Sequence, residues 1–247
     1  MSGLTIGLMG AGEFDPWAEE VDRWLLARAG AGDGRVLIVP TASAAEGDDV
    51  FDSWGDKGLE HYGRLGVPAE VAPLKTREDA YREDFLPLLD RASVVFFSGG
   101  NPAYLSATLN DTPFWSALVE RLDRGLAFAG CSAGMACLQD ITYDSDVNEM
   151  SEKLFKPGLG LFREVAFGPH WDMLDNWVPG AREYLVSWVP DGWRVLALDE
   201  NTAAVGDGLR WSVLGTGSAH TLVDGTWQDH PAGSSFALPL RRASDPA

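Results

Sequence analysis

The residues of this chain that point most directly to chemistry are Gly130-Cys131-Ser132-Ala133-Gly134, which form a G-x-S-x-G pattern. An apolar run at 126–129 precedes the pattern, and residues with helical character at 135–138 follow it. A strand that turns this tightly into a helix is a nucleophile elbow, in which backbone strain projects the central hydroxyl. We therefore predict that Ser132 is a catalytic nucleophile and that the Ala133 amide binds an oxyanion. The alternative is that these small residues serve only close packing.

A serine nucleophile needs a base, and the base needs a carboxylate that orients it. Among the four histidines, His170 follows an apolar strand and a Gly-Pro pair, and it is the favoured base. His220, in a predicted antiparallel strand, is the second candidate, whereas His61 and His230 are expected on a helix surface and in a loop. Glu200 ends a buried strand and is the predicted orienting carboxylate, unless it only begins a hairpin turn.

Three rival interpretations stay open from the residues alone. An esterase would use Ser132 with His220 as base and Asp199 or Asp207 as the carboxylate. A thiol enzyme would use Cys131, although this residue precedes the apex of the elbow. A binding protein could share the fold and have an inactive site.

A second oxyanion donor is predicted at the Gly99-Gly100 turn, where the missing side chains let a carbonyl oxygen approach the backbone. Asn101 follows the turn as a natural N-cap, and Pro102 suits the first turn of a helix.

These side chains must be positioned by the elements around them. Apolar runs predict strands at 4–9, 35–39, 69–74, 93–97 and 126–129, and helical spacing predicts helices at about 17–29, 50–65, 78–89 and 114–124. This alternation is typical of an α/β fold with a doubly wound, mostly parallel sheet, whose active site lies at the carboxyl ends of the strands. Turn signals at 206–208 and 224–225 predict antiparallel C-terminal strands, and residues 241–247 are expected to fray.

Composition narrows the functional classes. No compositional shift divides residues 1–247, so we predict a single α/β domain, and 45% hydrophobic residues suffice for a large core. The net charge of −18 argues against nucleic acid and anionic membranes as partners. Ten Trp and eleven Phe residues suggest an aromatic-walled pocket or a self-association surface, although core packing could account for most of them. A homodimer is compatible with this composition.

The cysteines, the N-terminal residues and the first glycine turn allow expectations about the cellular location and about cofactors. Cys131 and Cys137 are expected to be free thiols. The first residues lack signal-peptide features and no apolar run has membrane-spanning length, so we expect a soluble, cytoplasmic protein. No Cys/His grouping suggests zinc, and Gly10-Ala11-Gly12 does not continue into a dinucleotide motif. No metal or cofactor is predicted.

Five motifs together resemble the serine peptidase family that contains dipeptidase E (aspartyl dipeptidase) and cyanophycinase, over about residues 4–223. In chain order they are Val39-Pro40-Thr41-Ala42-Ser43, Phe97-Ser98-Gly99-Gly100-Asn101, Gly130-Cys131-Ser132-Ala133-Gly134, Gly168-Pro169-His170-Trp171 and Asp199-Glu200-Asn201-Thr202-Ala203. The resemblance implies a fold similar to class I glutamine amidotransferases, which is flavodoxin-like, with serine in place of the amidotransferase cysteine.

The resemblance also implies roles. It implies a serine peptidase that cleaves an amide bond of a small peptide through an acyl-enzyme, with Ser132, His170 and Glu200 as the triad and the amides of Gly100 and Ala133 as the oxyanion hole. The triad order differs from that of an α/β-hydrolase, in which the carboxylate precedes the histidine.

Substrate contacts are less well defined by the motifs. Asn101 lies in the family's G-G-N turn, and Arg163 and Arg182 flank the His170 segment. We predict these three as substrate-binding residues, since arginine can bind a carboxylate in bidentate fashion, although surface positions are its commoner role. Gly168 and Pro169 replace polar residues that precede the histidine in cyanophycinase, so the resemblance does not name the substrate.

Overall fold

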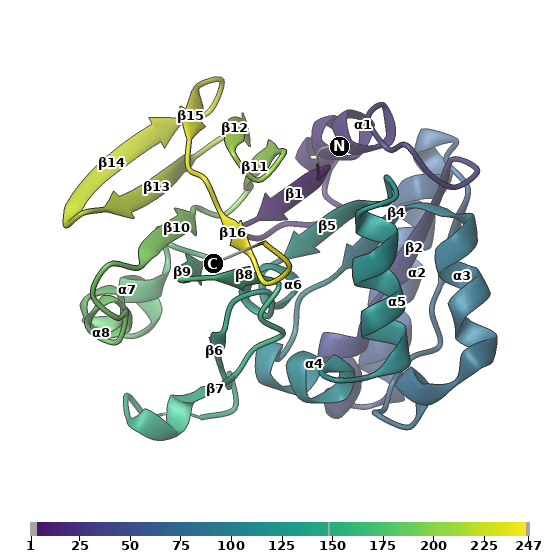
Figure 1. Cartoon of the computed structure of the whole chain (residues 1–247), viewed down its shortest axis with the longest axis horizontal. Helices are drawn as coiled ribbons and strands as arrows, with labels where there is room; N and C mark the ends of the chain where they lie inside the picture. Colours follow the sequence, from purple (N-terminus) through teal and green to yellow (C-terminus); the bar gives the residue numbers. More distant parts are fainter. Residues whose placement is uncertain (1–3, 148, 246–247) are drawn as a thin grey trace.

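The computed structural model describes residues 4–147 and 149–245, and its centre is an eight-stranded sheet (Figure 1). The strand order is β15-β12-β11-β1-β5-β4-β2-β3. Five neighbouring strands run parallel: β1 (Ile6–Met9), β5 (Ala127–Cys131), β4 (Ala92–Phe97), β2 (Arg35–Val39) and β3 (Ala69–Val71). Three antiparallel strands extend the sheet beyond β1: β11 (Thr202–Gly206), β12 (Arg210–Gly215) and β15 (Ser235–Ala237).

Helices cover both faces of the parallel strands. One face packs against α1 (Glu19–Leu26) and α2 (Asp48–Leu65), and the other packs against α3 (Leu86–Arg91), α4 (Pro102–Leu109), α5 (Pro113–Leu122) and α6 (Ala133–Ala136). Successive side chains of a strand point to opposite faces, so β2 contributes Val36 and Ile38 to one core and Leu37 and Val39 to the other. The predicted doubly wound, mostly parallel sheet is confirmed.

The C-terminal strands are antiparallel as predicted, but they divide between two sheets. A second sheet has the order β14-β13-β10-β9, with β9 (Val165–Gly168), β10 (Arg194–Leu198), β13 (Ser218–Val223) and β14 (Thr226–Pro231). Strands β9 and β10 are parallel, whereas the other pairs are antiparallel. Both predicted hairpins are present, but β11–β12 joins the central sheet and β13–β14 the second one (Figure 1).

Short elements connect the two sheets. Strand β6 (Ile141–Tyr143) pairs with β7 (Phe155–Pro157), and β8 (Phe162–Arg163) pairs with β16 (Arg241–Arg242). The expectation that the chain frays from Arg241 onward is therefore wrong for Arg241 and Arg242, and its last two positions, 246–247, lie outside the described residues.

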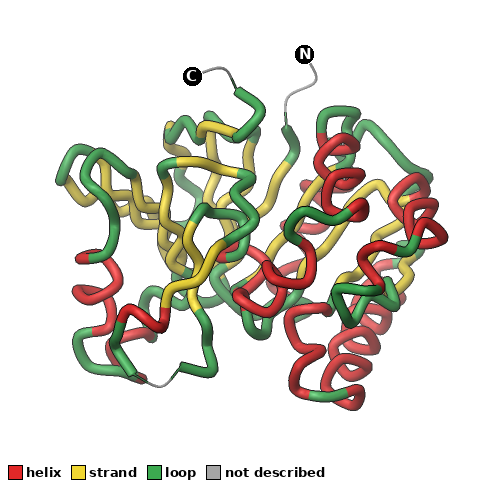
Figure 2. Tube along the Cα trace, turned by 60° about the horizontal axis from the view of Figure 1, so that its bottom comes forward, coloured by secondary structure: helices red, strands yellow, loops and turns green. Residues whose placement is uncertain are grey.

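Helices α7 (Leu174–Trp177) and α8 (Ala181–Ser187) lie beside the second sheet, apart from the helices of the central one (Figure 2).

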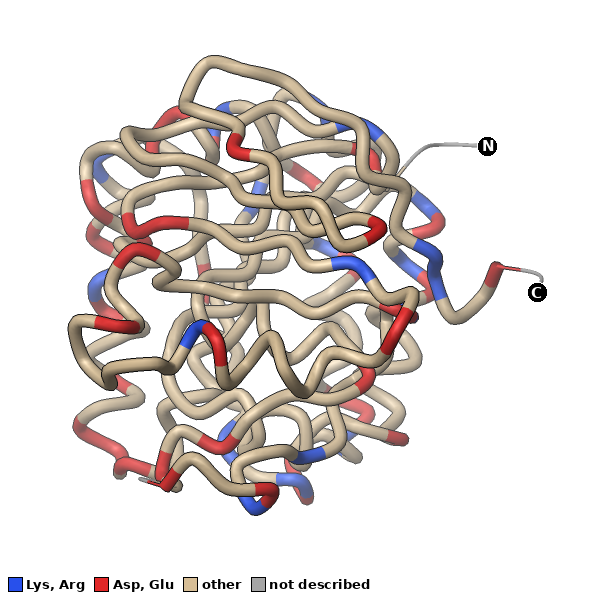
Figure 3. The backbone as a smooth tube through the Cα atoms, turned by 90° about the vertical axis from the view of Figure 1, so that its left-hand side faces the viewer, with Lys and Arg blue, Asp and Glu red and all other residues tan. Residues whose placement is uncertain are grey.

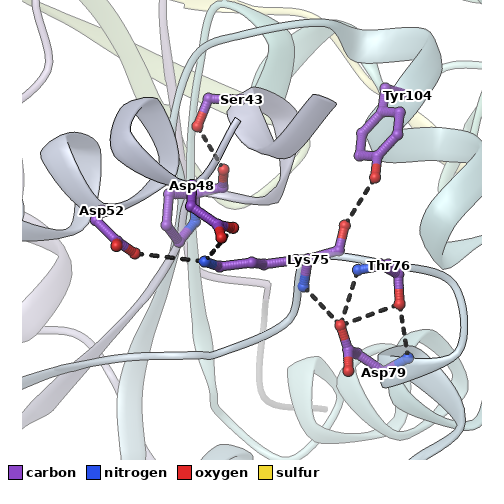
Figure 4. Close-up of polar contacts among 8 residues, drawn as sticks. Ser43, Asp48, Asp52, Lys75, Thr76, Asp79 and Tyr104 are labelled. Carbon is purple, nitrogen blue, oxygen red and sulfur yellow. Dashed lines mark hydrogen bonds and ion pairs between the residues drawn. The ribbon is translucent and has the colours of Figure 1, made fainter. Parts of the chain in front are cut away.

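The helix expected at 78–89 is also wrong over residues 78–85, and only residues 86–89 are helical, as part of α3. The chain forms two 3₁₀ turns, η3 (Asp79–Tyr81) and η4 (Glu83–Phe85), before α3 begins, because Arg82 is extended, with φ −76° and ψ 117°. The Asp79 carboxylate accepts the backbone N–H groups of Lys75 and Thr76, at 3.1 and 2.9 Å (Figure 4). Such local side-chain bonds compete with helical ones and favour turns.

Charge is distributed over the molecule. Acidic positions are spread along many loops, and basic positions are interspersed among them (Figure 3). Within the described part of the chain, no helix has both the length and the apolar character required to span a membrane.

Candidate active site

The predicted nucleophile elbow is present where β5 passes into α6. Ser132 has φ 49° and ψ −106°, a strained conformation for a residue with a side chain. Its N–H donates to the carbonyl of Met9 on β1, at 3.0 Å. A Cβ at Gly130 would lie 2.3 Å from the Gly134 carbonyl oxygen, and a Cβ at Gly134 would lie 2.2 Å from that of Phe97. Only glycine fits these two positions, which explains why the turn occurs at a G-x-S-x-G pattern.

His170 and Glu200 follow two neighbouring parallel strands, β9 and β10, whose carboxyl ends meet at one edge of the second sheet. His170 Nδ1 lies 2.9 Å from Glu200 Oε1, and His170 Nε2 lies 2.8 Å from Ser132 Oγ. The Glu200 N–H donates to Asp172 Oδ1 at 2.9 Å, which fixes the loop that carries the carboxylate. The structure thus brings together the three residues predicted from the sequence, and they form one hydrogen-bonded chain across the junction of the two sheets.

The two hydrogen bonds of His170 indicate which of its ring nitrogens carries the proton. With Glu200 ionised, His170 Nδ1 carries the proton and donates it to the carboxylate. His170 Nε2 is then an acceptor for the Ser132 hydroxyl. The His170 side chain is 21% exposed and lines the cavity described below, whereas that of Glu200 is 31% exposed and does not line it.

Two backbone amides are available beside Ser132. Ala133 is the first residue of α6, so its N–H has no partner within the helix, and Gly100 lies in the turn after β4 with φ 135°. Among residues 4–147 and 149–245, neither amide donates to a protein acceptor. Gly100 lines the same cavity as Ser132, and its role as an oxyanion donor stays a prediction.

The Gly100 turn is held by the P-T-A-S segment, which forms η2 (Thr41–Glu46). The Asn101 N–H donates to the Ala42 carbonyl at 2.8 Å, and a Cβ at Gly100 would lie 2.4 Å from that carbonyl carbon. Ser43 Oγ in turn donates to the Pro40 carbonyl at 2.8 Å (Figure 4). The P-T-A-S motif therefore has a structural role besides carrying the family resemblance: it packs against the Gly99-Gly100 turn and bonds to it.

The loop after β3 fixes this support in place. Lys75 Nζ lies 2.7 Å from Asp48 Oδ1 and 3.5 Å from Asp52 Oδ1, both on α2, while Tyr104 Oη donates to the Lys75 carbonyl at 2.9 Å (Figure 4). Thr41 Oγ1 donates to the carbonyl of the preceding residue, Leu74, at 2.6 Å. These bonds connect α2, η2 and α4 around one loop.

Glu13 is a buried carboxylate beneath the site, and no role was predicted for it. Its side chain is 8% exposed and follows β1. Oε1 accepts the Gly99 N–H at 2.7 Å, and Oε2 accepts the Cys131 thiol at 2.9 Å. Glu13 thus joins the oxyanion turn to the elbow. The sequence could have indicated this role, because Glu13 follows the first strand in a glycine-rich turn at the edge of the sheet where the active site is expected.

The thiol alternative is disfavoured by the environment of Cys131. Burial raises the pKa of its thiol well above the ordinary value, and the Glu13 carboxylate raises that pKa further. A buried, protonated thiol that donates to a carboxylate is a poor nucleophile. Cys131 and Cys137 are both free and buried, as expected.

The other histidines have partners away from Ser132. His220 lies between two carboxylates, with Nε2 3.0 Å from Asp199 and Nδ1 2.7 Å from Asp229, so the esterase arrangement is not formed. The surface expectation for His61 is wrong: it is 2% exposed, because its Nε2 lies 2.7 Å from the buried Asp22. His230 lies in β14 rather than in a loop.

The three predicted substrate-binding residues have other contacts. Asn101 Oδ1 accepts the first-turn N–H groups of α4 and is the predicted N-cap, and its Nδ2 donates to Asp144 and Asp146. Arg163 pairs with Asp140, and Arg182 pairs with Asp175 at 2.6 Å. None of the three lines the cavity at Ser132, so the structure does not bring them to the reacting groups.

A cavity of about 570 Å³ opens at Ser132 and His170. Its walls come from the β6–β7 segment, the β9 end, and the stretch from α7 to β10, and their aromatic side chains are Tyr143, Phe155, Phe167, Trp171, Trp177, Tyr184, Trp188 and Trp193. The aromatic-walled pocket proposed from composition therefore has specific members. The described residues contain no cluster of three or more His, Cys, Asp or Glu side chains that could hold a metal.

This chain is similar in sequence to known proteins. Cyanophycinase from Trichormus variabilis is 29% identical over 232 residues, which cover 90% of this chain and 74% of that protein. Cyanophycinase from Synechococcus elongatus is 32% identical over 211 residues, which cover 80% of this chain and 61% of that protein.

Two solved structures are similar as well. The structure of a peptidase from an acI-B1 Actinobacterium has a TM-score of 0.85 at 30% identity, covering 96% of this chain and 97% of that one. A putative peptidase E from Listeria monocytogenes EGD-e has a TM-score of 0.60 at 16% identity, covering 86% and 98%, which shows a shared fold. The model of peptidase family S51 matches residues 6–212. With most of its length matched by that model, and with the elbow and sheet arrangement described above, this chain belongs to peptidase family S51.

Proposed function

We propose that this protein is a serine peptidase that hydrolyses an amide bond of a small peptide through an acyl-enzyme. The observation that carries the proposal is the hydrogen-bonded chain from Ser132 through His170 to Glu200, with distances of 2.8 and 2.9 Å. The amides of Gly100 and Ala133 donate to no acceptor within the described part of the chain, Gly100 lines the cavity that opens at Ser132, and family membership supports peptidase chemistry.

The reaction begins when Ser132 Oγ attacks the substrate carbonyl and His170 Nε2 takes the hydroxyl proton. Glu200 holds the imidazole in the tautomer that can accept this proton and stabilises the imidazolium that forms. The amides of Gly100 and Ala133 bind the tetrahedral oxyanion. His170 then gives its proton to the leaving amine, which departs and leaves the ester of Ser132. A water molecule, deprotonated by the same histidine, hydrolyses the ester and restores the hydroxyl.

Labelling with a fluorophosphonate, followed by mass mapping, tests the assignment without a known substrate. We expect modification of Ser132 in the wild-type protein and none in Ser132→Ala. His170→Ala should slow labelling by about 10³-fold or more, by the loss of the base.

His220→Ala is the matched control for this experiment. His220 is 18% exposed and also lies against carboxylates, but it is bonded to Asp199 and Asp229 instead of Ser132. Its replacement should leave the labelling rate within about twofold of wild type, since its ring bonds to Asp199 and Asp229 and to no member of the Ser132–His170–Glu200 chain. Labelling that depends on His220 would favour the esterase arrangement. A folded wild-type protein that is not labelled would favour a binding protein.

A further inference from the structure

We propose that the substrate of this site carries a large, uncharged apolar side chain next to the scissile bond, and that the cavity beside His170 binds it. The inference rests on the proposed function for its chemistry. It goes beyond that function by naming the class of peptide that is cleaved.

The first observation is an aromatic wall formed by segments distant in sequence. Phe155, from β7, stacks on two rings of the α8 region, with centroid distances of 6.2 Å to Tyr184 and 4.7 Å to Trp188. Tyr184 and Trp188 lie edge to face at 6.2 Å. Such a wall offers flat apolar contact area at a small cost in conformational entropy.

The second observation concerns the apolar surface left open around the cavity. Of the nine exposed large hydrophobic residues in the described ranges, five line this cavity: Ile141, Met150, Trp177, Val178 and Trp188. Trp177 is 55% exposed and lies beside the His170 ring, with a centroid distance of 5.1 Å and the two rings tilted by 55°. Apolar surface gathered at a cavity mouth, beside the reacting groups, indicates a site that an apolar ligand covers.

The third observation is that few charged side chains line the cavity. Among the described residues lining the cavity, the only acidic or basic ones are Glu149 and the catalytic candidate His170, and no lysine or arginine is present. The nearby Arg163 and Arg182 pair with carboxylates elsewhere. An aspartyl side chain here would lose water without gaining a cation, and among the described lining residues a guanidinium would find only the exposed Glu149 as a carboxylate partner. The cavity therefore selects against both charged classes.

The test compares kcat/KM for two short peptide series that are identical except for one residue, placed first on the acyl side and then on the leaving-group side of the scissile bond. In each series that residue is Phe, Leu, Asp or Arg. On the side that occupies the cavity, we expect Phe and Leu to be preferred over Asp and Arg by about 10- to 100-fold. A preference for Asp or Arg on both sides overturns the inference.

Fluorophosphonate titration of the same preparation keeps the two proposals apart. If Ser132 is labelled but charged peptides are preferred, the proposed function stands and the substrate class is wrong. If Ser132 is not labelled, calorimetric binding to Ser132→Ala still tests the cavity, with N-acetyl-phenylalanine amide and N-acetyl-aspartate amide as the probes. Tighter binding of the phenylalanine probe supports the inference, and equal or weaker binding refutes it.

Two variants locate the selectivity in the aromatic wall and its rim. Trp188→Ala should reduce the preference for Phe over Asp by about 10-fold, and Val178→Arg should improve cleavage of the Asp peptide by supplying a cation at an exposed position. Trp24→Ala on α1 is the matched tryptophan control and should leave the preference unchanged, since α1 lies on the opposite side of the molecule from α8 (Figure 1). A Trp188→Ala profile identical to that of Trp24→Ala would argue against the wall as the selecting surface.

Discussion

Glu13→Gln should weaken catalysis by loosening the oxyanion turn, although Glu13 does not touch the substrate site. The carboxylate accepts the Gly99 N–H at 2.7 Å and the Cys131 thiol at 2.9 Å, so it sets the direction of the peptide that leads to Gly100. Glutamine keeps the size and one acceptor oxygen but removes the charge. Its amide nitrogen must then face either the Gly99 N–H or the Cys131 sulfur.

The size of the effect follows from these bonds. A hydrogen bond to a charged group contributes about 1.5–3 kcal/mol, against about 0.5–1.5 kcal/mol for a neutral one, so the turn loses roughly 1–1.5 kcal/mol. If this loss appears as misdirection of the Gly100 amide, kcat should fall about 10-fold. Complete loss of one oxyanion donor, about 10²–10³-fold, sets the upper limit.

The assay is kcat and KM on the best peptide, together with the rate of fluorophosphonate labelling at Ser132. Both kcat and the labelling rate should fall, with KM nearly unchanged, because the turn acts on the transition state. Asp22→Asn is the control, since Asp22 is also buried and bonded to two groups, His61 and Tyr62, at 2.7 and 2.8 Å. It should lower stability and leave kcat intact. If Glu13→Gln also lowers only the melting temperature, the positioning role is refuted.

Further predictions concern the elbow, the loop after β3 and the buried thiol. Gly134→Ala should abolish labelling of Ser132, because its Cβ would lie 2.2 Å from a carbonyl oxygen of β4. Gly63→Ala is the control, since a Cβ there points into open space on α2. This variant should raise the free energy of unfolding in urea by about 0.5–1 kcal/mol. Burial alone would raise the pKa of Asp79, but hydrogen bonds from residues 75–76 outweigh it and hold that pKa below its ordinary value. Its ionised form therefore stabilises the fold above the unfolded-state pKa, and the contribution is lost as pH falls through the lowered pKa. Asp79→Asn should thus cost about 1–2 kcal/mol at neutral pH and less in strong acid, and an equal cost at both would contradict this reasoning. Cys131 should resist iodoacetamide in the native protein and react only in denaturant, as judged by mass mapping, and rapid native modification would disprove its burial as a protonated thiol.

Local patterns were sufficient for the parallel half of the fold. Strands β1, β2, β4 and β5 appear in the sequence as short apolar runs, because strands covered on both faces bury nearly all of their side chains. The elbow was predictable for a related reason: small residues at fixed spacing are the only ones that its close backbone contacts admit. The proximity of Ser132, His170 and Glu200 was predicted from strand ends and the family resemblance, and their catalytic role stays a prediction.

Predictions failed where a side-chain contact that the local pattern does not show decided the outcome. His61 lies on a polar stretch of α2, yet Asp22 from α1 binds its ring, and burial follows from that pairing. Residues 78–85 of the helix expected at 78–89 form turns instead, next to the loop whose backbone N–H groups the Asp79 carboxylate accepts. Arg163 and Arg182 are near His170 in sequence, but their carboxylate partners hold them away from the cavity.

By itself, the sequence determined the strained elbow, the glycine turn and the strand ends that carry the histidine and the carboxylate, because each is visible in the residue types of a short segment, as glycines at tight turns or polar residues after apolar runs. Only the tertiary structure decided that β9 and β10 form a second sheet, that Glu13 supports the oxyanion turn, and that aromatic residues from β7 and the α8 region share one wall. These features arise from contacts between segments far apart in the chain. Apolar periodicity shows that a side chain will be buried, but not which other side chain it will meet.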